Sequence, residues 1–294
     1  MLKGLAASVI ASFLFGALYL LAPWLAPLDG EQVFGWRILS TLPFTTALLL
    51  LRGQWPQVQA LLLRARQEPL WGLGLLASAA LLGVQLWLFL WAPLHGRALP
   101  VSLGYFLLPL VMVLAGRLLF GEQLTRLQWL ATVLAALGVL HEIWRAGGMS
   151  WETWLVALGY TLYFVLRRHL RTDHLGGHWL DMMLLIPAAL WFVLRTPSSF
   201  NALAQHPNLW GMVTVLGIVS AVALALYMAA SRLLPLGLFG LLSYLEPALL
   251  ALAALALGES MEPGQWPSYG PIFAAVAVLI ADGVLRMRQH ARTP

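Results

Sequence analysis

The sequence RALPVSLGYFLLP at residues 97–109 recurs in altered form as RLLPLGLFGLLSYLEP at residues 232–247. In each copy an arginine and a proline precede an apolar run that contains a tyrosine and ends at a second proline. The similarity continues beyond both copies in one register. Separations of 135 to 138 residues relate four matched pairs: Arg97 and Arg232, Pro109 and Pro247, Glu122 and Glu259, and Trp129 and Trp266. We interpret these matches as an internal repeat, with chance similarity between Leu-rich segments as the alternative.

Both copies lie in a chain that is too apolar for a water-soluble fold. Of its 294 residues, 61% are hydrophobic and 10% are charged, whereas soluble domains are about 45–50% apolar. The hydrocarbon core of a bilayer requires about 20 apolar residues per helix, and lipid offers no hydrogen-bond partner to a non-helical backbone. Ten candidate transmembrane helices follow, at residues 5–25, 32–51, 70–91, 99–120, 127–144, 151–166, 179–194, 209–230, 236–257 and 267–285.

Each half of the chain contains five of these candidates. We expect a first five-helix repeat over residues 4–146 and a second over residues 150–288. Because five is odd, the second repeat must enter the membrane from the opposite side. Transporters built from such inverted repeats bind their substrates near the bilayer midplane, between the repeats. The predicted fold is therefore an all-α polytopic membrane protein of ten transmembrane helices.

The basic residues predict the orientation of the chain. With a cytoplasmic N-terminus, 13 of the 17 Lys and Arg residues fall on the cytoplasmic side. This bias predicts that both termini are cytoplasmic in a multi-pass protein of the bacterial inner membrane. It also accounts for the net charge of +5 without a nucleic-acid partner. Cysteine is absent, which excludes disulfides and thiolate metal sites.

Several short motifs resemble those of the chloramphenicol-sensitivity (RarD-type) permeases, in the EamA branch of the drug/metabolite transporter superfamily. They are Glu31 with Trp36-Arg37, the stretch from Ser102 to Pro109, Gly121-Glu122, the stretch from Gln128 to Ala131, Gly138-Val139, and, in the second half, Leu245-Glu246-Pro247 and Gly258-Glu259. The resemblance covers essentially the whole chain. It implies ten helices in two inverted repeats, a central cavity and the transport of small metabolites or drugs.

Glu246 is the ionisable residue nearest the middle of a candidate span, at residues 236–257. A charge at that depth costs about 3 kcal/mol on insertion scales, so we expect the side chain to avoid lipid. It could couple transport to protons or hold a cationic group of a substrate. The alternative is a permanently protonated carboxyl that bonds a neighbouring helix.

Arg37 lies near the outer end of the span at residues 32–51. Its planar fork of donors could attract a substrate with a carboxylate. The alternative is that the side chain extends to the membrane surface while its stem stays in the lipid. The neighbouring Trp36 either caps the cavity or belongs to the interfacial aromatic belt.

A set of polar and aromatic residues at mid-membrane depth could line a substrate cavity. Each ring offers an apolar face, and each tyrosine adds a hydroxyl that needs a partner when buried. Such a lining suits an amphipathic or aromatic metabolite, although helix packing explains any single member. The serines could equally bond the backbone of their own helices. The set is Tyr19, Gln85, Trp87, Ser102, Tyr105, Tyr160, Tyr163, Tyr227, Ser243 and Tyr244.

The other polar residues are interpreted as structural. Glu122 and Glu259 each follow a glycine at a helix end, where we expect them to bond free backbone N–H groups of the next helix. We expect the segment from Gly176 to His178 to be a loop. Residues close to span ends are expected to be solvated: His141, Glu142, Asp181 and Asp282.

The predicted function is secondary active transport of a small metabolite or drug-like molecule by alternating access. Proton coupling or exchange would supply the energy, since the sequence contains no phosphate-binding loop. An intramembrane enzyme is one alternative, but no catalytic constellation is recognisable and we expect neither a metal nor a cofactor. A channel or a non-transporting scaffold is the other. Substrate identity, transport direction and the choice between monomer and homodimer stay open.

Overall fold

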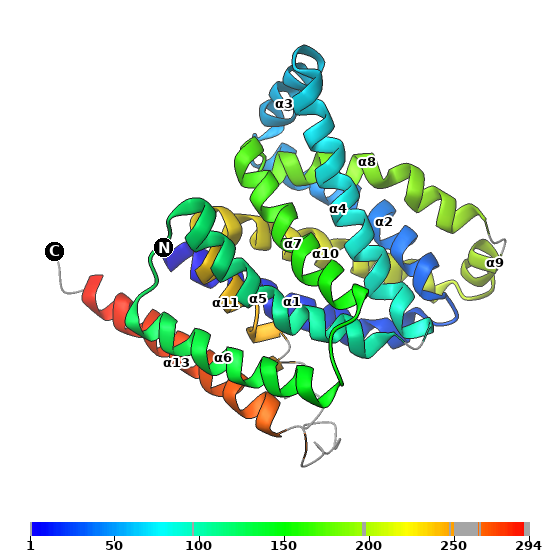
Figure 1. The fold of residues 1–294 in the computed structure, drawn as a ribbon. Helices are drawn as coiled ribbons and strands as arrows, with labels where there is room; N and C mark the ends of the chain where they lie inside the picture. Colours follow the sequence, from blue (N-terminus) through cyan, green and yellow to red (C-terminus); the bar gives the residue numbers. More distant parts are fainter. Residues whose placement is uncertain are drawn as a thin grey trace. The chain divides into compact units, whose positions relative to one another are not determined.

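In the computed structural model, the described residues are 2–95, 97–195, 198–246, 248–249, 264 and 266–290. Within them the regular structure is helical and no strand occurs (Figure 1). This confirms the all-α class. The helices are α1 (Leu2–Leu21), the 3-10 helix η1 (Ala22–Leu25), α2 (Gly30–Leu51), α3 (Trp55–Gln67), α4 (Pro69–Leu94), α5 (Ala98–Phe120), α6 (Arg126–Arg145), α7 (Trp151–Leu170), α8 (Leu175–Leu194), α9 (Ser198–Gln205), α10 (Asn208–Leu233), α11 (Leu236–Leu242) and α13 (Trp266–His290).

Six helices in the described part of the chain are long and apolar enough to cross a membrane. They are Gly30–Leu51, Pro69–Phe89, Pro100–Phe120, Arg126–Arg145, Leu175–Leu194 and Asn208–Leu233. Of the remaining candidates, residues 5–25, 151–166 and 267–285 also fall largely within helices, α1, α7 and α13. The candidate at residues 236–257 begins with α11, and most of its later part lies outside the described residues.

Two short helices were not predicted from the sequence. α3 begins at Trp55 and carries Pro56 in its first turn, a position that needs no backbone N–H. It packs Val58 and Leu61 inward, and its last turn carries Arg64 and Arg66. α3 and α9 have 13 and 8 residues, too few to span a bilayer.

The chain forms two compact units, and each unit draws helices from both halves of the sequence. Unit 1 comprises Met1–Gly16, Leu99–Thr161 and Ala230–Pro294, and unit 2 comprises Ala17–Ala98 and Leu162–Ala229. The predicted repeats, in contrast, are continuous segments of the sequence. Each unit is described by itself below.

In unit 2, α2 packs along α8 in the antiparallel direction (Figure 1). Glu31 at the start of α2 pairs with Arg195 just after α8. At the other end, Trp179 Nε1 donates to Thr46 Oγ1 at 2.7 Å. Gly35 permits the close approach between them, because a Cβ there would lie 2.7 Å from the carbonyl oxygen of Ala189. Small residues at crossings are a common means of packing helices in membranes.

In unit 1, α6 packs along α13, again antiparallel (Figure 1). Gln128 Nε2 near the start of α6 donates to Asp282 Oδ2 late in α13 at 3.1 Å. Ser268 Oγ early in α13 donates to Glu142 Oε2 late in α6 at 2.5 Å. Gly138 leaves room for the Ser268 backbone at the crossing.

The expectation of solvated residues near the span ends is wrong for three of the four. Glu142 and Asp282 are 4% and 6% exposed, and Asp181 is fully buried. Each carboxylate has a polar partner on a neighbouring helix. Hydropathy does not show which helices are neighbours, so it could not predict this burial. Only His141 is partly exposed, and its ring Nδ1 lies 2.8 Å from Ser268 Oγ.

Glu122 caps a helix, as predicted, but the helix is not the one that follows it in the chain. Its two carboxylate oxygens accept hydrogen bonds from the backbone N–H groups of Leu236 and Gly237, at 2.6 and 2.8 Å. These groups begin α11, which is not the next helix along the chain but one more than 110 residues later. The negative charge is also favourable at a helix N-terminus. Glu259, which has the same predicted role, lies outside the described residues.

Candidate functional site

A small pocket lies inside unit 2, among α2, α4, α8 and α10. Its cavity volume is about 10 Å³, which is close to the space needed for one water molecule. Arg37 and Thr41 supply the polar part of its wall. The remaining wall is apolar and consists of Phe34, Ile38, Leu86, Met182 and Leu224.

Arg37 and Thr41 share one face of α2, a single turn apart. Arg37 Nε donates to Ser220 Oγ on α10 at 3.1 Å, which fixes one edge of the guanidinium. Thr41 is 1% exposed, and its hydroxyl has no hydrogen-bond partner among the described residues. The pocket therefore combines a held cation with an unsatisfied hydroxyl.

Trp36 lies in an aromatic cluster and does not line this pocket. Its ring meets Phe200 of α9 and Trp210 of α10 edge-on, with centroids 5.7 Å away in both cases. Both partner rings are about half exposed, at 45% and 51%. This arrangement favours the aromatic-belt interpretation of Trp36.

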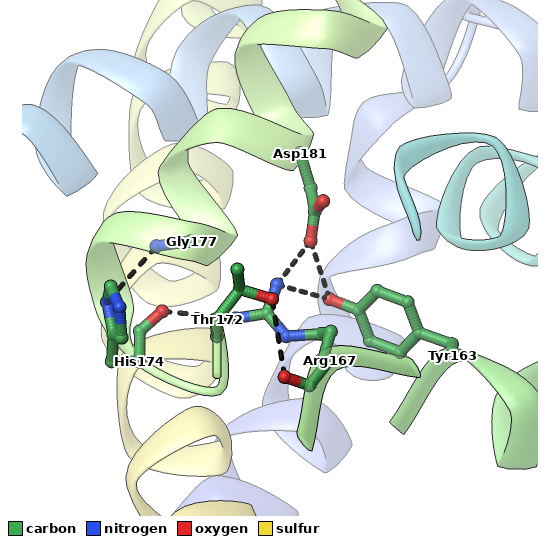
Figure 2. Close-up of polar contacts among 6 residues, drawn as sticks. All are labelled: Tyr163, Arg167, Thr172, His174, Gly177 and Asp181. Atoms are coloured by element: carbon green, nitrogen blue, oxygen red, sulfur yellow. Dashed lines mark hydrogen bonds and ion pairs between the residues drawn. The ribbon is translucent and has the colours of Figure 1, made fainter. Parts of the chain in front are cut away.

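A buried ion pair joins the end of α7 to the start of α8 (Figure 2). Arg167 Nη1 donates to Asp181 Oδ2, and each side chain is 1% exposed. Tyr163 Oη also donates to Asp181 Oδ2 at 3.0 Å and accepts from Arg167 Nη1 at 3.1 Å. The other arm of the guanidinium, Nη2, donates to the carbonyl oxygens of Thr172 and His174. Arg167 thus organises the turn between the two helices.

His178 is the least satisfied polar side chain in this part of unit 2. It is fully buried, and neither ring nitrogen has a hydrogen-bond partner among the described residues. The charges of Arg167 and Arg37 both act on the imidazole. The predicted loop at Gly176–His178 is wrong, because these residues form the first turn of α8. His174 caps that helix by accepting from the N–H of Gly177 at 3.3 Å.

In unit 1, the predicted tyrosines divide between structural contacts and a partly exposed pair. Tyr244 is fully buried, and its hydroxyl donates to the carbonyl oxygen of Phe106 on α5 at 2.7 Å. Ser243 Oγ donates to the Gly240 carbonyl at 2.6 Å, which is the backbone alternative considered for it. Tyr105 and Tyr160 are half-buried, with ring centroids 5.9 Å apart.

The other predicted site residues are divided between unit 1 and unit 2. Glu246 is half-buried just beyond α11, and Ser102 on α5 is exposed. Gln85 on α4 is 1% exposed. Three aromatic residues complete the set: Trp87 with its ring 5.2 Å from Trp91, Tyr227 with its ring 5.8 Å from Phe164, and Tyr19 on α1, whose side chain is outside the described part.

Of the predicted site residues, Arg37 therefore lines the pocket, and Tyr163 contacts the buried ion pair. Four members of these clusters are not predicted from the sequence: Thr41, Arg167, Asp181 and His178. A partial signal existed for Arg167, because Tyr163 and Arg167 are four residues apart on one helix face. The pairing with Asp181 depends on how α7 and α8 meet, which the sequence pattern does not encode.

Comparison with known proteins places this membrane protein among transporters. The EamA-like transporter family matches residues 2–141. An uncharacterized transporter of Pasteurella multocida is 41% identical, with 99% of each chain covered. The chloramphenicol-sensitive protein RarD of Pseudomonas aeruginosa is 43% identical, over 99% of this chain and 97% of that protein. The RarD protein of Escherichia coli is 27% identical, over 99% and 98%.

A solved crystal structure has a similar fold, with a TM-score of 0.66 at 20% identity, covering 94% of this chain and 98% of that chain. The chain belongs to the EamA-like transporter family, among its RarD-type permeases. It is a multi-pass protein of a bacterial membrane.

Proposed function

We propose that this chain is a secondary active transporter that moves a small metabolite or drug-like molecule across the inner membrane by alternating access. Ten transmembrane helices would form two inverted five-helix repeats, with both termini in the cytoplasm. The energy would come from proton coupling or from exchange. The transporter names of its relatives support the class of function.

The observation that carries this proposal is the antiparallel packing of two helix pairs. In the repeat register of 135 to 138 residues, α6 is the counterpart of α13, and α2 is the approximate counterpart of α8. Counterparts in repeats of opposite orientation run in opposite directions across the membrane. Within their units the helices of both pairs are antiparallel, as the contacts of Glu31 with Arg195 and of Gln128 with Asp282 indicate, and this supports repeats of opposite orientation.

Counterflow in proteoliposomes tests this function. Vesicles with the purified chain are loaded with an unlabelled compound and diluted into the labelled one, across a panel of amino acids, amines and antibiotics. We expect at least one compound to accumulate transiently in these vesicles and not in protein-free vesicles. Absence of counterflow for the whole panel, with folded protein present, would contradict the proposal.

The role of Glu246 is tested in the same vesicles with and without a pH gradient. A proton-coupled carrier should lose its response to the gradient in Glu246→Gln, because the amide cannot exchange a proton. Glu68→Gln is the matched control. Glu68 lies just after α3, and its exposed carboxylate pairs with Arg64 in the last turn of that helix. If Glu246→Gln keeps the rate and the pH dependence of the wild type, Glu246 has no part in coupling.

A further inference from the structure

We propose that α3 binds the headgroups of anionic phospholipids at the membrane surface, and that the exposed leucines beside its arginines enter the acyl region below. The residues concerned, called here the α3 surface, are Arg52, Leu62, Leu63 and Arg66, all of them exposed. The proposal concerns contact with the bilayer and does not depend on the transport function.

The position of α3 in the chain holds it at the membrane surface. Three residues separate its start at Trp55 from the end of the spanning helix Gly30–Leu51, and one residue separates its end at Gln67 from the spanning helix Pro69–Phe89. Leu51 and Leu70, at these ends of the two spans, are both 84% exposed, which is favourable in hydrocarbon and not in water. Both ends of α3 therefore lie close to the boundary between headgroups and acyl chains.

One face of α3 is fixed to the protein. Val58 and Leu61 are buried in a hydrophobic cluster that also contains Leu49 of α2 and Trp71 of α4. Figure 1 shows α3 beside the start of α4, and α3 also contacts α8. This packing determines which residues of α3 face away from the protein.

Two leucines next to the buried face are exposed instead. Leu62 and Leu63 are 43% and 56% exposed. Contact with water costs about 25 cal/mol for each Å² of apolar surface, whereas the acyl boundary of a bilayer covers the apolar face of an interfacial helix. The exposed leucines at the ends of the adjoining spans continue this apolar surface. The occupant that fits it is therefore lipid.

The arginines of the α3 surface identify the kind of headgroup. Arg66 follows Leu62 by four residues and Leu63 by three, so the three side chains share one side of the helix. The apolar stem of an arginine can lie along leucines while its guanidinium reaches the phosphates. Guanidinium groups bind phosphate oxygens through charge-assisted hydrogen bonds. Arg52 provides a second exposed cation just before α3.

The charge balance around α3 favours an anionic headgroup over a zwitterionic one. Residues 52–68 contain three arginines and one glutamate, which gives a net charge of +2. The glutamate, Glu68, is engaged by Arg64, with Nε and Oε1 3.1 Å apart. Within this segment it therefore does not offset the charges of Arg52 and Arg66.

A fluorescent label on a single cysteine tests whether the α3 surface contacts lipid. The chain contains no cysteine, so Leu63→Cys can carry an environment-sensitive dye in proteoliposomes. Met149→Cys, in the loop between α6 and α7, is the control. We expect doxyl-labelled lipid to quench the dye at position 63, and aqueous iodide to quench the dye at position 149. Quenching at position 63 by iodide alone would overturn the proposal. Protection there from both quenchers would indicate a protein contact and would also overturn it.

The preference for anionic lipid is measured with the same dye on the full chain in non-ionic detergent. Leu63→Cys is titrated with phosphatidylglycerol or with phosphatidylcholine, and we expect phosphatidylglycerol to act at the lower concentration. Adding Arg66→Gln should raise the phosphatidylglycerol midpoint about fivefold, and adding Arg52→Gln as well should raise it about 25-fold, because each cation near an anionic surface contributes separately. The phosphatidylcholine midpoint should not change, and Arg66→Lys should retain most of the preference.

Arg126→Gln is the matched control, because it removes one charge from an exposed arginine at the start of α6, in unit 1. It should leave the phosphatidylglycerol midpoint unchanged. Added salt should weaken phosphatidylglycerol binding by the wild-type arginines, since exposed charges are screened. If Arg66→Gln and Arg126→Gln have the same midpoint, or if both lipids act at the same concentration, the α3 surface does not select anionic lipid and the proposal is wrong. Neither result bears on counterflow, which tests transport separately.

Discussion

Arg167 and Asp181 form a fully buried ion pair that joins the last turn of α7 to the second turn of α8. The pair closes a 14-residue separation, and the guanidinium also binds two carbonyl oxygens of the intervening turn. Burying two charges is costly unless each is fully compensated. The pair therefore links the last turn of α7 to the second turn of α8 through a contact that neither charge can lose without being stranded.

Removal of one member of this pair should destabilise the protein strongly. Arg167→Met leaves the Asp181 carboxylate buried beside Tyr163, and we expect a loss of about 3–5 kcal/mol. Replacing both residues, in Arg167→Met with Asp181→Leu, should cost less than the single change because no charge is stranded. Reversible unfolding in mixed detergent measures both variants.

The exposed pair of Arg64 and Glu68, whose side chains are 43% and 53% exposed, is the control. Arg64→Met should cost no more than about 1 kcal/mol. If Arg167→Met is no more damaging than Arg64→Met, the buried pair has no structural role.

The carboxylate of Glu122 should stabilise the start of α11. Glu122→Gln keeps one oxygen acceptor and loses the charge, so we expect a loss of about 1–2 kcal/mol. Hydrogen exchange should also become faster at the backbone N–H groups of Leu236 and Gly237, while those in the middle of α10 stay protected. Unchanged exchange at both groups would show that the cap is dispensable.

Two glycines of α10 should respond to alanine in opposite ways. At Gly217 a Cβ would lie 2.7 Å from the carbonyl oxygen of Ser40 on α2, whereas at Gly211 it would meet nothing within 4 Å. Gly217→Ala should therefore cost about 1–3 kcal/mol through overpacking. Gly211→Ala should stabilise by about 0.5–1 kcal/mol through helix propensity. The melting temperatures of the two variants provide the comparison, and equal values would contradict the crossing at Gly217.

The sequence pattern predicts the helices well because each one satisfies its own backbone and must be long and apolar to face lipid. α3 escaped it because a helix of 13 residues is too short to span a bilayer. Its Pro56 occupies the first turn, where proline is compatible with a helix.

The candidate site was less predictable because it depends on contacts between helices. Arg37 could be selected as an isolated charge within an apolar span, but its partner Ser220 is 183 residues away. Asp181 and His178 lie close to a span boundary, where hydropathy alone indicates solvent. Their burial follows from the packing of α8 in unit 2, which periodicity does not specify.

The inverted repeat is tested most directly by finding the side of the membrane on which four points of the chain lie. The sequence contains no cysteine, so single cysteines can be introduced at Gln67 and Met149, both exposed, and fluorescent proteins fused at each terminus. We predict that the fusions at both termini fluoresce, as cytoplasmic termini require. An impermeant thiol reagent should label Met149→Cys, on the outer side, in intact cells. It should label Gln67→Cys, on the cytoplasmic side, only after permeabilisation. Termini on opposite sides, or a Met149→Cys that is protected in intact cells, would contradict two repeats of opposite orientation.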